Sequence, residues 1–90
     1  METINTRELL DILQDINCTT LIRYLNNFRF TKFRATYTTG IKANYYLASD
    51  FLNILYTLLL IKKKEKAAEN LKNKFNFVER IEWEDFICKT

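Results

Sequence analysis

The chain lacks histidine and proline altogether and contains a single glycine, Gly40, and two isolated cysteines, Cys18 and Cys88. Without histidine or a Cys-x-x-Cys pair, neither a zinc site nor a Cys–His nucleophile is expected, and we predict no metal and no cofactor. There is also no glycine-rich phosphate loop and no pair of carboxylates in a plausible cleft, so we do not expect an enzyme. Because linkers are rich in glycine and proline, the 90 residues are predicted to form one domain.

Long apolar runs are also missing. The longest, Phe51 to Ile61, has 11 residues, whereas a helix that spans a bilayer needs about 20. The first residues, Met1 to Ile4, have neither the basic nor the apolar region of a secretory signal. We therefore expect a cytoplasmic protein without membrane contact, in which both cysteines are reduced thiols.

Acidic residues are absent from one continuous stretch of 34 residues, Ile16 to Ser49. The formal charge is −3 before this stretch, +5 within it and +1 after it. Its five bases are Arg23, Arg29, Lys32, Arg34 and Lys42. Such segregation indicates a polyanionic partner, and we favour double-stranded DNA; no small-molecule substrate is evident. The alternative is that the bases simply form a solvated surface.

The pattern of apolar residues predicts an α+β fold. The expected elements are a helix capped by Asn5 or Thr6 and ending near Gln14, a tight turn at 16–18, a helix opening at Cys18 or Thr19, strands at 30–37 and 41–47 with a turn at Gly40, and a helix from Ser49 to Ile61. The helical pattern continues through 62–75, which is mostly polar and is expected to project from the core. For 77–87 both a strand and a short helix remain open. The domain thus has a core at 6–61, with an extension and acidic tail at 62–90.

The order helix, tight turn, helix, hairpin, helix over residues 6–61 resembles a winged helix-turn-helix domain. The segment Ile16–Leu25 looks like the turn and recognition helix of that class. Together with Tyr45–Leu47 and a helix opening at Ser49–Leu52, it resembles the MerR-like and phage excisionase-like modules in particular. The resemblance implies a recognition helix in the major groove of DNA and a wing against the backbone or minor groove. The position before Ile16, commonly glycine in that class, is Asp15 here.

The resemblance also implies roles for individual residues. Donors at the start of the second helix are expected to contact phosphates, Arg23 to reach guanine or a phosphate, and two asparagines to pair with adenine edges. The remaining residues are expected to be wing contacts, or to add positive charge in the case of Arg29. The full predicted DNA-binding set is Thr19, Thr20, Arg23, Asn26, Asn27, Arg29, Lys32, Arg34, Thr38, Thr39 and Lys42.

A homodimer is expected because so small a module generally needs two copies for specificity, and Ala67, Ala68 and Leu71 with the acidic tail are the predicted pairing surface. A DNA-binding homodimer of this kind would be a small transcriptional regulator, an excisionase-type factor or a centromere-binding adaptor of a plasmid or phage segregation system. A different class of function also remains open. A phage-type inhibitor of a host protein would use the aromatic anchors Tyr37, Tyr45, Tyr46 and Trp83.

Overall fold

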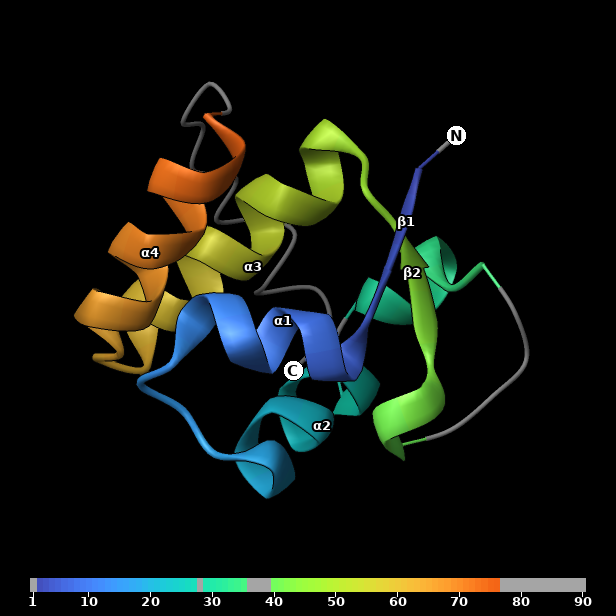
Figure 1. Ribbon diagram of the computed structural model, residues 1–90, viewed down its shortest axis with the longest axis horizontal. Coiled ribbons are helices and arrows are strands. Elements are labelled where there is room, and N and C mark those ends of the chain that lie inside the picture. Colours follow the sequence, from blue (N-terminus) through green and yellow to red (C-terminus); the bar gives the residue numbers. More distant parts are fainter. Residues whose placement is uncertain (1, 28, 36–39, 77–90) are drawn as a thin grey trace.

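The computed structural model describes residues 2–27, 29–35 and 40–76, which form an α+β fold of four helices and a two-stranded antiparallel sheet (Figure 1). In chain order the elements are β1 (Thr3–Asn5), α1 (Thr6–Leu13), α2 (Cys18–Asn27), the 3₁₀ helices η1 (Arg29–Phe33) and η2 (Gly40–Lys42), β2 (Asn44–Tyr46), α3 (Ser49–Ile61) and α4 (Glu65–Phe75). The predicted fold class and the helices at 6–13, 18–27 and 49–61 are confirmed at this level. None of the helices in these described ranges has the length and apolar character needed to cross a bilayer.

The first helix begins where the sequence predicts, through a reciprocal pair of hydrogen bonds. The backbone N–H of Glu8 donates to Oδ1 of Asn5 (2.8 Å), and the backbone N–H of Asn5 donates to Oε1 of Glu8 (3.1 Å). This capping box satisfies two donors at the helix start. The helix ends at Leu13, and Gln14 at its C-cap has a positive φ of 63°.

The sheet differs from the predicted hairpin. β2 pairs with β1, so that Ile4 lies opposite Tyr45. The prediction of a partner strand at 30–37 is wrong for Phe30–Phe33, because these residues belong to η1. Among the described residues of the expected strand, Arg34 forms an isolated bridge with Tyr45. The expected return strand is shortened to three residues, because its first two residues belong to η2.

The spacing of two phenylalanines explains the 3₁₀ helix. Residues three apart eclipse in a 3₁₀ helix but point to opposite faces of a strand. In η1, both Phe30 and Phe33 reach the same ring, Phe51, edge to face, with centroid distances of 5.4 and 5.8 Å. Tyr45 stacks on Phe51 at 5.6 Å. A strand would send one of these two phenylalanines into solvent, so the shared contact favours the tighter helix.

The helix α3 is the centre of the core, and its side chains are buried at Phe51–Leu55 and Thr57–Leu59. Because apolar residues surround most of this helix, more than one of its sides is buried. Ser49 is its first residue, and Ala48 occupies the N-cap position. The interior thus joins α3 to apolar side chains from each of the other helices.

The expectation that 62–75 continues α3 and projects outward is wrong. The chain reverses after Ile61, and α4 packs beside α1 and α3 (Figure 1). Ala67, Ala68 and Leu71, which we had placed on a dimer surface, are fully buried in this packing. Small side chains let helix backbones approach closely, and the apolar area removed from water outweighs the polar character of the rest of the segment.

A Schellman motif produces the reversal. The N–H of Lys63 donates to the carbonyl of Leu60 (3.0 Å) and that of Lys64 to the carbonyl of Leu59 (2.8 Å). Lys63 takes the left-handed conformation with φ 60°, a position at which glycine is usual. A side chain with a Cβ is strained there by about 1 kcal/mol.

Replacing Lys63 by glycine should therefore stabilise the protein by about 0.5–1 kcal/mol, because relief of strain exceeds the added chain entropy of the unfolded state. Urea unfolding followed by circular dichroism measures the change. The matched control is Lys62→Gly, since Lys62 has φ −84° and glycine gains nothing at that position. If both variants lose stability equally, the strain assigned to Lys63 is wrong.

Candidate nucleic-acid interface

The outward face of α2 gathers four of the predicted site residues. Thr19, Arg23, Asn26 and Asn27 are exposed, and at about 100° per residue they fall within a single arc of the helix. The opposite side carries the buried core residues of α2. Thr20 is half-buried at the edge of the exposed arc. The structure thus brings donors, an amide pair and a guanidinium together on one polar face.

Asn17 caps the start of α2, whereas the sequence predicted only a tight turn at this position. The backbone N–H of Thr20 donates to Oδ1 of Asn17 (2.8 Å), an arrangement typical of an N-cap residue. That amide is therefore engaged within the protein and is not one of those left to contact a phosphate. The hydroxyl of Thr19 remains at the exposed start of the helix.

Arg34 lies farther along the chain but contacts the end of α2. One guanidinium nitrogen, Nη2, lies 2.7 Å from Oδ1 of Asn26 and 3.4 Å from the hydroxyl of Tyr45. The guanidinium carbon also lies 5.7 Å from the centre of the Tyr45 ring. Arg34 is half-buried, and its Nε is buried with no hydrogen-bond partner in the part of the chain that the structure describes. The contact orients the Asn26 amide and joins the segment that directly follows η1 to α2.

The other predicted cations lie on the 3₁₀ helices, which pack beside α2 (Figure 1). Lys32 is exposed on η1, and its Nζ lies 4.9 Å from the centre of the Phe33 ring. Lys42 is exposed on η2. Arg29 is the first residue of η1. The described cations of the acid-free stretch therefore lie on α2 or on segments that contact it or Asn26.

Two predicted site residues, Thr38 and Thr39, lie outside the described residues, as do Tyr37 and Trp83. Of the aromatic anchors proposed for a protein inhibitor, Tyr45 is only 1% exposed and stacks in the core, which rules it out as an anchor. Tyr46 is 38% exposed.

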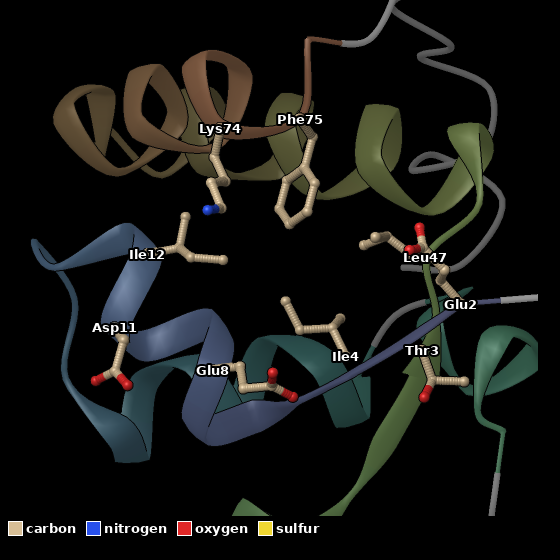
Figure 2. Close-up of a pocket in the computed structure, with 9 residues that line it drawn as sticks. All are labelled: Glu2, Thr3, Ile4, Glu8, Asp11, Ile12, Leu47, Lys74 and Phe75. Carbon is tan, nitrogen blue, oxygen red and sulfur yellow. The ribbon is translucent and has the colours of Figure 1, made fainter.

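The structure also contains a groove that was not predicted from the sequence. It lies between β1, α1, α4 and Leu47 (Figure 2). Its residues come from four separate segments, each of which contributes only one to three of them, so no local sequence pattern predicts the groove. The groove belongs to different elements from the polar face of α2.

Comparison with known proteins gives no further information about these residues. No family model, curated protein or solved structure matches the chain. Conclusions about function therefore depend on the chemistry of α2 and the cations beside it.

Proposed function

We propose that this protein binds double-stranded DNA through α2, as a small transcriptional regulator or a phage or plasmid DNA-binding factor. The observation that carries the proposal is the single exposed face of Thr19, Arg23, Asn26 and Asn27 within a stretch that has no acidic residue. Phosphates approaching this face meet donors and positive charge without a carboxylate from the same stretch. This combination is the electrostatic footprint expected of a nucleic-acid-binding surface.

The dimensions of α2 suit the major groove. Its 10 residues correspond to a length of about 15 Å, and the major groove, about 12 Å wide, admits one helix. In this proposal Arg23, near the middle of the exposed face, pairs with guanine O6 and N7 or with a phosphate. Thr19, one turn earlier, is placed to donate to a phosphate.

The contact with Arg34 gives Asn26 a defined orientation for reading a base. Oδ1 of Asn26 accepts from Arg34, yet a carbonyl oxygen has two lone pairs and can accept a second bond. The Nδ2 group of the same amide remains a donor. Adenine offers the complementary donor and acceptor, N6 and N7, so the two contacts are compatible. In this proposal Arg34 is a positioning residue as well as a source of positive charge.

The helix-turn-helix part of the proposal rests on α1 and α2. They are separated by the four residues 14–17, a connection of the length found in helix-turn-helix motifs. The place of the wing would be taken by η2 together with the bridge between Arg34 and Tyr45, beside which the N–H of Ala35 donates to the carbonyl of Asn44 (2.8 Å). Cations flanking α2 would then contact phosphates on either side of the groove.

The proposal keeps a homodimer bound to a palindromic site, but the dimer interface must lie elsewhere than on the surface predicted from the sequence. Ala67, Ala68 and Leu71 are buried within the chain and cannot form it. A regulator would occupy one short palindrome, whereas a segregation adaptor would spread over repeated sites. Footprinting on selected genomic fragments distinguishes these two patterns.

The proposal is tested by binding to random-sequence duplex DNA, measured by fluorescence anisotropy from about 50 to 200 mM KCl. If the five bases of the acid-free stretch neutralise about four or five phosphates, a plot of log K against log salt should have a slope near −4. A protein that acts only on other proteins would bind weakly and with a slope near zero. That second result would remove DNA as the partner.

A further inference from the structure

A groove with a volume of about 470 Å³ lies on the β1, α1 and α4 side of the molecule (Figure 2). Its apolar lining comes from Ile4, Ile12, Leu47 and Phe75. Ile4 is buried, while the other three remain partly exposed. Figure 2 shows the ring of Phe75 pointing from the end of α4 into the space between these side chains. The fold thus leaves apolar surface facing a hollow, a feature typical of a site that receives another molecule.

The edge of this groove is acidic. Glu2, Glu8 and Asp11 line it and are exposed, and Lys74 is the one base among its lining residues. The Glu8 carboxylate is held in place because Oε1 accepts from the backbone N–H of Asn5 (3.1 Å). The whole chain has a net charge of +3, so this negative edge is a local property. It runs counter to the overall charge of the protein.

A second hollow of about 410 Å³ continues the groove along α1 and α4. Asp11, Ile12 and Lys74 line both hollows, and Gln14 and Asn70 line the far end. The two together form an elongated depression that follows α1, whose eight residues span about 12 Å. This shape suits an extended or helical peptide better than a compact small molecule.

We propose that the groove docks a basic amphipathic segment of a partner protein. Apolar side chains of that segment would cover Ile12, Leu47 and Phe75, and its lysines or arginines would face Glu2, Glu8 and Asp11. Helical peptides bind in this way by placing one apolar face in a groove and charged residues along its rim. DNA is disfavoured here because the rim repels phosphates. The tail at 77–90 is disfavoured because its sequence is itself acidic.

The probe is a fluorescent helical peptide of about 14 residues with leucine on one face and lysine on the other. A second peptide has glutamate in place of every lysine. Binding to the full chain is measured by anisotropy, and the contact surface is mapped by backbone amide chemical shifts. We expect the lysine peptide to bind, with shifts at Ile12, Leu47 and Phe75, and the glutamate peptide not to bind.

The test variant is Glu2→Gln/Glu8→Gln/Asp11→Asn, which removes three charges and keeps the shapes of the side chains. Glutamine at position 8 also preserves the capping box. The control, Asp15→Asn/Glu65→Gln/Glu69→Gln, removes three exposed acids outside the groove. We expect the test variant to bind the lysine peptide about tenfold more weakly. The control should keep the affinity of the wild-type protein to within about twofold.

Three results would overturn the proposal. The first is no binding of the lysine peptide, or shifts that map to other elements. The second is an equal loss of affinity in the test and control variants, which would indicate general attraction to acidic residues. The third is concentration-dependent shifts at Ile12, Leu47 and Phe75 without peptide, which would show that a second copy of the chain occupies the groove.

Discussion

Replacing Phe51 by alanine should lower the free energy of unfolding by about 3–5 kcal/mol, the largest stability loss that we expect from a single substitution. Three aromatic rings, those of Phe30, Phe33 and Tyr45, contact Phe51 with centroid distances between 5.4 and 5.8 Å. Alanine leaves a cavity that this cluster fills only in part. Urea unfolding monitored by circular dichroism at low temperature measures the loss.

The comparison with Phe51→Leu separates ring contacts from simple burial. Leucine keeps most of the apolar volume but loses the edge-to-face and stacked pairs, each worth about 0.5–1.5 kcal/mol. We expect this variant to fold and to lie between the wild-type protein and Phe51→Ala in stability. Equal stability of Phe51→Leu and the wild-type protein would show that the three ring contacts contribute little.

The starts of α1, α2 and α3 were the part of the fold that the sequence predicted well, because the signals that set them are local. Asn5 and Glu8 stand at the spacing of a capping box, and the structure contains both of its hydrogen bonds. The buried positions of α2 and α3 follow helical periodicity. Each of these signals lies within one or two turns of chain.

The hairpin was mispredicted because aromatic residues indicate burial more directly than they indicate strands. Phe30 and Phe33 are both in the core, and their odd separation excludes a regular strand with both rings inward. The strand that does pair with β2 is β1, only three residues long. No periodic pattern can be recognised in so short a segment.

The chain reversal between α3 and α4 was not predicted, because it depends on contacts with residues that are distant in the sequence. High helix propensity at 62–75 predicted one continuous helix, but the contacts of Ala67 and Leu71 with the core favour a break. Lysine, and not glycine, occupies the left-handed position of the Schellman motif, so the usual sequence signal for a helix end was absent.

The candidate DNA-binding face could be predicted because exposure on a helix follows from periodicity. Its coupling to Arg34 could not, since the contact with Asn26 depends on η1. The acidic groove was equally inaccessible to sequence reasoning. Together the two surfaces separate the charges of the molecule: described cations of the acid-free stretch lie at or beside α2, and three carboxylates line the groove. In the two proposals above, DNA and a basic partner therefore contact different elements of the fold.

Replacing Arg23 by alanine should weaken binding to a specific DNA site by about 1–3 kcal/mol, or roughly 5- to 150-fold in affinity. Arg23 is exposed near the middle of the polar face of α2, where truncation removes a guanidinium without disturbing the core. If Arg23 pairs with guanine, the loss on the specific site exceeds the loss on random DNA. If it contacts only a phosphate, the two losses are equal and the salt slope becomes shallower by about one unit.

The matched control for this experiment is Arg7→Ala. Arg7 is also an exposed arginine on a helix, α1, and its loss changes the net charge by the same amount, but it lies outside the acid-free stretch. Mobility-shift titrations of both variants on a selected fragment should show a large loss for Arg23→Ala and a loss within about twofold for Arg7→Ala. Equal losses would mean that net charge, and not the face of α2, determines binding, and the recognition role of Arg23 would then be wrong.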